Sequence, residues 1–134
     1  AGDMTWIGGL SPEGGRDARV RLSYQTVENR GDIPPALAEK MYPYFYGCDR
    51  CLRACPHLHN ASPSTESAFT PRQELLNATE KDWMNLTVEQ YRAWFKGSAV
   101  KRAKYAGLVR NLKAIRDHKD KHGSQEDLDK KKNT

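Results

Sequence analysis

The three cysteines of this 134-residue chain all fall within eight residues. Cys48, Cys51 and Cys55 form a Cys-x2-Cys-x3-Cys-Pro pattern, which is the second half of a run that holds iron-sulfur clusters through thiolates. In such a run the cysteine before proline usually serves a second, neighbouring cluster. A metal site normally needs four ligands, so the missing ligand decides what chemistry these thiols can support.

Two histidines just beyond the cysteines offer that ligand. Either His57 or His59 would complete a Cys3His set, which suits Zn2+ or an unusual cluster. The spacing from Cys55 to His57 is short for a zinc site. The alternative is that the thiols stay reduced and pack as small apolar residues beside the aromatic run at 44–46. We disfavour a catalytic thiol with His57 as base, because proximity in sequence supplies neither a lowered pKa nor an orienting group.

A second candidate region is the basic stretch from Lys96 to His122. It holds nine lysines and arginines against two aspartates, a local net charge of +7, whereas the whole chain carries +5. A basic helix suits a phosphate backbone, because neutralising phosphates releases condensed counterions. The alternative is an ordinary solvated helix face. If nucleic acid binds, we expect the contacts at Lys101, Arg102, Lys104 and Arg110.

The elements that must position these residues are predicted to be helices, in a mainly α protein. We expect one small domain of several short helices, one long basic C-terminal helix and flexible termini. Residues 20–27 alternate like a strand but also place apolar side chains on one helical face, and we favour a helix. Pro34 and Pro35 open a short helix over 36–42, which Pro43 ends.

Threonines mark three further helix starts. Thr70 precedes a proline suited to the first helical position, and Thr79 is a second cap. Thr87 has capping-box spacing and begins a helix that ends at Gly97. That helix carries an apolar stripe, which we interpret as core: Tyr91, Trp94 and Phe95.

The last helix is predicted to run from Ala99 to His118, with Ser98 as its cap. Its apolar residues fall near one face at i, i+4 spacing, with a shift of that face around Gly107. They are Val100, Ala103, Leu108, Leu112 and Ile115.

Composition sets the domain limits. The chain is 37% hydrophobic and 29% charged, with a mean hydropathy of -0.86, so part of it is expected to lie outside any packed core. We predict a flexible segment at 1–15, a helical domain at 16–122 and a disordered polar tail at 123–134. The absence of a membrane-length apolar stretch or a signal-type N-terminus predicts a soluble, cytoplasmic protein with no membrane partner. Clustered cysteines in odd number also fit a reducing compartment.

Several separate motifs follow one another along the chain between about Asp17 and about Ile115. They are Asp-Ala-Arg-x-x-Leu-Ser-Tyr-Gln-Thr-Val-Glu at 17–28, Gly-Asp-Ile-Pro at 31–34, Tyr-Gly-Cys-Asp-x-Cys-x3-Cys-Pro at 46–56, Phe-Thr-Pro-Arg at 69–72, Leu-Thr-x-Glu-x-Tyr at 86–91, and Phe-Lys-Gly-Ser-Ala-Val-Lys-Arg-Ala-Lys-Tyr at 95–105 through Arg-Asn at 110–111. In this order they resemble the C-terminal part of the epoxyqueuosine reductases.

The resemblance implies a cobalamin-dependent enzyme with two [4Fe-4S] clusters that reduces an epoxide in tRNA at the last step of queuosine synthesis. By the same resemblance, Cys48 and Cys51 match two ligands of one cluster, and Cys55 matches the ligand that crosses to the other. Arg21 stands where the family has a cysteine, and a guanidinium cannot ligate a metal. The family's cobalamin domain, with its catalytic acid, and its first cysteine motif lie upstream of the matching region.

Together these observations predict a truncated iron-sulfur domain of the epoxyqueuosine reductase type. We expect it to be non-catalytic on its own and to bind tRNA through the basic helix. The alternative is a metal or cluster carrier subunit that acts with a separate cobalamin-binding or ferredoxin-like chain. A third reading is an inactive remnant that binds neither a cluster nor zinc.

Overall fold

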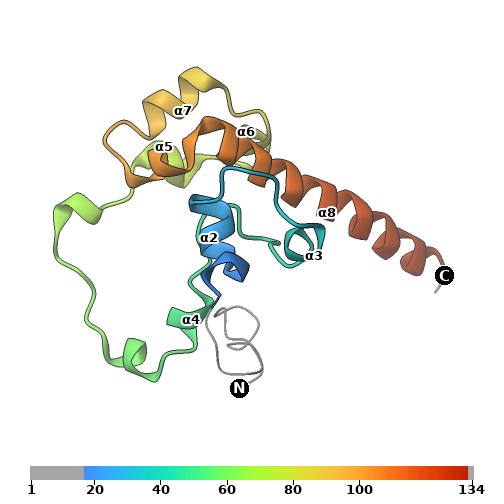
Figure 1. Cartoon of the computed structure of the whole chain (residues 1–134), viewed down its shortest axis with the longest axis horizontal. Coiled ribbons are helices and arrows are strands. Elements are labelled where there is room, and N and C mark those ends of the chain that lie inside the picture. Colours follow the sequence, from blue (N-terminus) through green and yellow to red (C-terminus); the bar gives the residue numbers. More distant parts are fainter. Residues whose placement is uncertain (1–16, 133–134) are drawn as a thin grey trace.

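The computed structural model describes residues 17–132, with side chains at every position except 59 and 124–132. Within this range the chain forms helices and no strand (Figure 1). The mainly helical fold predicted from the sequence is therefore confirmed. The elements are η1 (Ala18–Val20), α2 (Leu22–Val27), α3 (Pro35–Ala38), α4 (Arg50–Arg53), η2 (Pro56–Asn60), η3 (Ser67–Phe69), α5 (Gln73–Asn77), α6 (Glu80–Met84), α7 (Val88–Trp94), η4 (Ala99–Ala103) and α8 (Lys104–Lys132).

The long helix α8 organises the fold. Its first part packs against α2, α3, α6 and η4, and the rest extends away from the other helices (Figure 1). Leu108, Leu112 and Ile115 are buried on one side of it, at the spacing that aligns side chains along one helical face. The described backbone is helical to Lys132, although the sequence predicted a disordered tail from residue 123.

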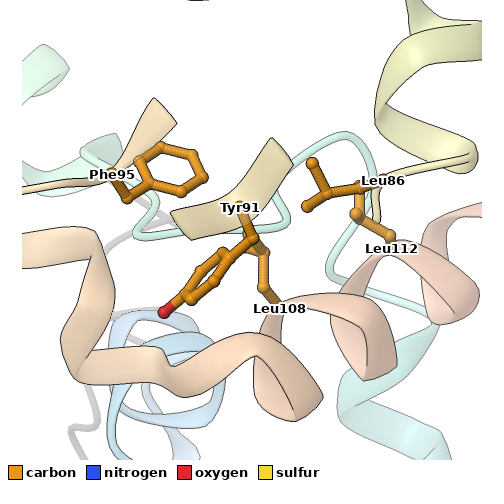
Figure 2. Close-up of a cluster of buried hydrophobic side chains, with 5 residues drawn as sticks. All are labelled: Leu86, Tyr91, Phe95, Leu108 and Leu112. Atoms are coloured by element: carbon orange, nitrogen blue, oxygen red, sulfur yellow. The ribbon is translucent and has the colours of Figure 1, made fainter. Parts of the chain in front are cut away.

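One half of the core joins α7 to α8. Five buried side chains form it, and Figure 2 labels them all: Tyr91 from α7, Leu86 and Phe95 from the segments on either side of α7, and Leu108 and Leu112 from α8. Trp83 and Trp94 pack against this group, with their rings edge-to-face and 5.4 Å apart. The predicted apolar stripe of the α7 helix is therefore core.

The other half of the core brings α2 and the segment after α3 onto α8. Leu22, Met41, Cys48 and Ile115 are buried together there. The predicted helix over 20–27 is present as η1 followed by α2. The helix predicted over 36–42 is shorter than expected, because α3 ends at Ala38.

Two of the three predicted threonine caps are confirmed. Thr79 and Thr87 each accept a hydrogen bond from the third residue of the following helix, and each forms a complete capping box. The prediction for Thr70 is wrong, because Thr70 ends η3 and α5 begins only at Gln73. Arg72, just before α5, instead donates to backbone oxygens at the end of α7, including that of Trp94 at 3.0 Å.

The predicted continuous helix from Ala99 to His118 is interrupted. Ser98 caps the short helix η4, with a 3.2 Å hydrogen bond from the Val100 amide to its hydroxyl. Lys104 then adopts a left-handed φ of 62°, which ends η4 and starts α8 in a new direction. The predicted shift at Gly107 is therefore wrong in position, since Gly107 lies within α8.

Candidate functional site

A buried polar network fixes the backbone that leads to the cysteines. Asn111 on α8 is fully buried, and its Nδ2 donates to the backbone oxygens of Thr26 at 2.7 Å and Phe45 at 2.9 Å. The Thr26 hydroxyl accepts a 3.0 Å hydrogen bond from the Gly47 amide. Gly47 has a φ of 65°, a conformation that glycine adopts without steric cost. The chain therefore turns into Cys48 at a position set by α2 and α8.

Arg110 belongs to the same network. Its Nη1 donates to the backbone oxygens of Asn29, at 2.9 Å, and of Gly31. Its Nη2 donates to Gln25 O at 2.8 Å, and both Nη2 and Nε donate to the Asn111 side chain. Burial lowers the pKa of the guanidinium from its ordinary value. All five N–H donors are used, so Arg110 stabilises the fold and has no donor left for a phosphate.

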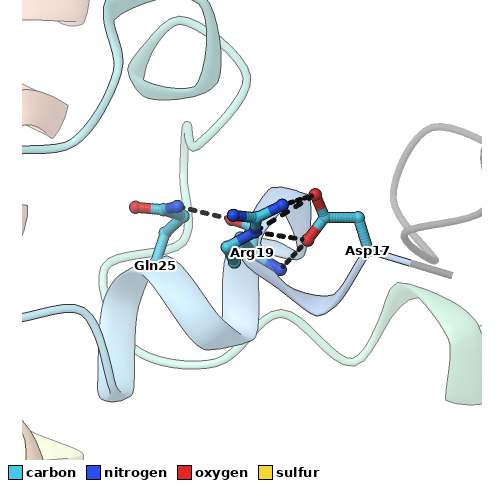
Figure 3. A network of polar contacts seen from close by, with 3 residues as sticks. All are labelled: Asp17, Arg19 and Gln25. Atoms are coloured by element: carbon cyan, nitrogen blue, oxygen red, sulfur yellow. Dashed lines mark hydrogen bonds and ion pairs between the residues drawn. The ribbon is translucent and has the colours of Figure 1, made fainter.

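The short helix η1, which precedes α2, is held by a local ion pair (Figure 3). Arg19 donates through Nε and Nη2 to the Asp17 carboxylate at 2.9 Å, and hydrogen bonds from Arg19 lower the pKa of Asp17. The buried Gln25 side chain donates to the backbone oxygen of Arg19. Arg21, which stands at the family's cysteine position, is exposed and adjoins Leu22, a neighbour of Cys48 in the core.

The three thiols lie in different surroundings. Cys48 is buried and packs with Tyr44 and Phe45, as the apolar alternative predicted. Cys51 lies on α4 and is exposed, which contradicts that alternative for this residue. Cys55 is half-buried just before η2, and all three cysteines are free.

The segment after Cys48 contacts the rest of the molecule mainly near its two ends, at Tyr44 and through Arg72 and Leu75. From 49 to 77 almost every described side chain is exposed, and Figure 1 shows the chain following a wide arc from α4 to α5. We call residues 49–77 the exposed arc. Tyr44 anchors its start, because the guanidinium groups of Arg50 and Arg53 lie 5.2 and 5.9 Å from the centre of its ring. The arc exposes four large apolar side chains: Leu52, Leu58, Phe69 and Leu76.

The described thiols do not form a metal site by themselves. Among the side chains that the structure describes, one group of three metal-ligating residues converges within 4.8 Å, and it contains no cysteine. Cys48 faces the core while Cys51 faces outward, and His57 is exposed. The residues described here therefore do not fit a [4Fe-4S] cluster or a Cys3His zinc site without a rearrangement or ligands from elsewhere.

The basic residues gather around a hollow between residues 29–32 and the start of α8. We call it the basic hollow. Its volume is about 410 Å³, and Arg30, Lys104 and Gly107 are among its lining residues. Lys101 and Arg102 lie on the adjoining η4 and are exposed. The hollow is therefore a concave surface with three cations, Arg30, Lys104 and Arg110, one carboxylate, Asp32, and small neutral residues between them.

Only part of the predicted basic surface is available. Arg102 forms an ion pair with Glu28 through Nε, and the hydrogen bond from Arg102 lowers the pKa of Glu28. Lys119 and Lys121 pair with glutamates on neighbouring elements. Among the described residues, five other cations of the stretch make no ion pair: Lys96, Lys101, Lys104, Lys113 and Arg116.

Sequence reasoning missed Arg30 as a member of this surface. Its Nη2 donates to the backbone oxygen of Arg102 at 2.7 Å, which places it beside η4. Seventy-two positions separate the two residues, so no local pattern could have joined them. None of the described helices combines the length and the apolar character needed to cross a membrane.

Comparisons with known proteins support the resemblance carried by these motifs. The chain is 40% identical over 96 residues to the epoxyqueuosine reductase of Cellulophaga algicola, a match that covers 72% of this chain and 31% of the relative. It is 35% identical over 103 residues to the Gloeobacter violaceus enzyme, covering 73% and 32%, and 35% identical over 96 residues to that of Pseudomonas aeruginosa, covering 72% and 27%.

These matches confirm that most of the chain is similar to one region of the epoxyqueuosine reductases. The chain spans about a third or less of the length of these curated relatives. No family model matches the sequence. No solved structure matches it either.

Proposed function

We propose that this chain is a tRNA-binding module of the epoxyqueuosine reductase type that is not catalytic by itself. Its similarity to one region of these reductases supports the family part of the proposal. The basic hollow carries the binding part, because it presents Arg30 and Lys104 on a concave surface beside the exposed Lys101. A cationic side chain without a carboxylate partner can neutralise a phosphate. This releases condensed counterions, so the affinity for nucleic acid falls as the salt concentration rises.

Arg110 is left out of this proposal although the sequence predicted it as a contact. Its donors are occupied within the molecule, so its substitution would report on folding. Arg102 remains a contact, since its Nη groups extend beyond the Nε that faces Glu28 and its side chain is 67% exposed. The proposed contacts are therefore Lys101, Arg102 and Lys104, with Arg30 added.

The test is titration of labelled tRNA at several salt concentrations, with two matched double variants. Lys101→Ala/Lys104→Ala removes two charges at the basic hollow, and Lys113→Ala/Arg116→Ala removes two charges beside α6. We expect the first pair to weaken binding about tenfold and to reduce the salt slope by about 1.5, because roughly 0.7 to 0.9 counterions are released for each phosphate contact. The second pair is expected to leave the slope nearly unchanged.

Two results would contradict the proposal. One is absence of tRNA binding by the full chain at low salt. The other is an equal loss of affinity in both double variants, because binding would then depend on net charge and not on the basic hollow.

The exposed arc favours a second candidate function, in which the chain is a carrier subunit for a separate cobalamin-binding chain. The arc combines the accessible Cys51 with large exposed apolar side chains such as Phe69, which is 75% exposed. Such a surface suits contact with a partner that supplies the missing ligands. Anaerobic iron and zinc analysis tests it. Less than about one metal per several chains, with three thiols titrating after denaturation, would favour the tRNA-binding module.

A further inference from the structure

Two imidazoles and one carboxylate meet where the segment after α3 touches α8. Glu39 directly follows α3, and His118 and His122 lie one turn apart on α8. His118 Nδ1 is 3.1 Å from Glu39 Oε2, and His122 Nε2 is 3.6 Å from the same oxygen. One ligand atom from each residue lies within 4.8 Å of the others. This group is separate from the cysteines and from the basic hollow.

The distances in this group are close to those of a metal coordination sphere. In a tetrahedral zinc site with bonds of roughly 2.0 to 2.2 Å, neighbouring ligand atoms lie about 3.3 to 3.6 Å apart. The two oxygen-to-nitrogen distances, 3.1 and 3.6 Å, lie close to this range. Histidines at i and i+4 share one helical face, which is the spacing that helical zinc sites use. Small side-chain movements would therefore open room for an ion between the three donors.

Neighbouring side chains hold two of the three donors in position. Lys121 Nζ donates to Glu39 Oε1 at 2.7 Å, which leaves Oε2 directed at the imidazoles. The ring of His118 stacks on Tyr42, with centres 5.1 Å apart and planes at 19°. Such outer contacts orient metal ligands and reduce the entropy lost when an ion binds.

The group is also open to solvent. The His118 side chain is 21% exposed and that of His122 is 57% exposed. A hollow of about 230 Å³ adjoins Glu39 and His118, and it has room for water as a further ligand. Zinc sites with three protein ligands keep an open position for water or substrate, whereas structural zinc sites are closed by four protein ligands.

We propose that Glu39, His118 and His122 form a binding site for a divalent transition metal ion, with Zn2+ as the favoured ion. Imidazole nitrogen together with one carboxylate selects zinc and its neighbours over magnesium or calcium, which take mainly oxygen ligands. Bound zinc would join α8 to the segment after α3 and so stabilise their contact.

The experiment measures Zn2+ binding calorimetrically with the full chain carrying Cys51→Ser and Cys55→Ser. These changes remove the two thiols that lie outside the core and would compete for zinc. We expect about one Zn2+ per chain and a rise in the melting temperature. Adding His118→Ala and His122→Ala should weaken binding at least about a hundredfold, since two of three ligands are lost. Circular dichroism without metal checks that the helices remain.

A further variant serves as the control. His57→Ala/His59→Ala removes the same number of imidazoles elsewhere and should leave the affinity unchanged. The proposal is overturned if zinc affinity survives His118→Ala/His122→Ala, if it is lost in His57→Ala/His59→Ala, or if the full chain binds no zinc.

Discussion

The helical body and the exposed arc both carry motifs of the same family. The motif residues of the body are bonded within the molecule, whereas those of the arc are mostly exposed to solvent. The body is formed by α2, α6, α7 and α8. Its motif residues form hydrogen bonds with other parts of the body. Asn111 and Arg110, for example, pair with backbone groups up to 85 positions away. In the arc, Cys51 is exposed, and Leu52, Leu58 and Phe69 are 50%, 45% and 75% exposed.

This difference separates two meanings of a retained motif. The motif at 95–111 is explained by the fold, because its buried members hold α8 to α2 and to the turn before Cys48. The motif at 46–56 is explained by the fold only at its start, where Gly47 and Cys48 are anchored. The described residues give the exposed Cys51 no structural role.

The largest effect is expected at Asn111, which tests whether the 95–111 motif serves the fold. Asn111→Ala leaves the backbone oxygens of Thr26 and Phe45 without a donor in the interior. We expect a loss of about 3 kcal/mol in the free energy of unfolding, measured by urea denaturation. Asn77→Ala, on the exposed arc, is the matched control and should cost less than about 0.5 kcal/mol. Equal costs would remove the distinction between body and arc.

The second prediction compares a serine substitution at the buried Cys48 with the same substitution at the exposed Cys51. Cys48→Ser places a hydroxyl among Leu22, Met41 and Ile115, which have no polar group to offer it. We expect a loss of about 2 kcal/mol, because a buried hydroxyl without a partner is costly. Cys51→Ser should change the stability by less than about 0.5 kcal/mol. A large cost at Cys51, seen by thermal melting in the absence of metal, would show that the arc is packed in solution.

Sequence reasoning succeeded where the physical signal is local. The capping boxes at Thr79 and Thr87 each depend on residues three positions apart, and the face of α8 repeats every turn. It failed at Lys104, because lysine has no preference for positive φ and its presence gives no signal that a helix ends there.

Long-range pairing explains the remaining differences at the candidate site. Arg110 looked like a surface cation because the carbonyls that it binds lie about 80 positions away. The spacing of His118 and His122 is visible in the sequence, but nothing local joins them to Glu39. The exposed arc shows the converse, since a strong local motif gave no information about whether its ligands meet.

Helix capping gives a third contrast between the two regions, of about 1 kcal/mol. Thr87 accepts a hydrogen bond from the Gln90 amide at 3.2 Å in the body, whereas Thr70 in the arc follows the end of η3 and begins no helix. Thr87→Ala should therefore lower the unfolding free energy by about 1 kcal/mol, and Thr70→Ala by almost nothing. Chemical denaturation of the two variants side by side measures the difference. The comparison would fail if Thr70→Ala proved the more destabilising change.

The smallest expected effect has the opposite sign and lies in the centre of the body. Tyr91 is buried between Phe95 and Tyr105, and its hydroxyl has no hydrogen-bond partner among the described residues. Burial raises the pKa of this hydroxyl, because the ionised form loses its contact with water. Tyr91→Phe removes the unpaired oxygen and keeps the ring contacts, so we expect stability to rise by about 0.5 kcal/mol. Thermal melting with Tyr105→Phe as control checks this, because Tyr105 donates to the Leu86 backbone at 2.9 Å and its variant should be less stable. A destabilised Tyr91→Phe would mean that the hydroxyl finds a partner, and that even the body is completed by a group outside the described residues.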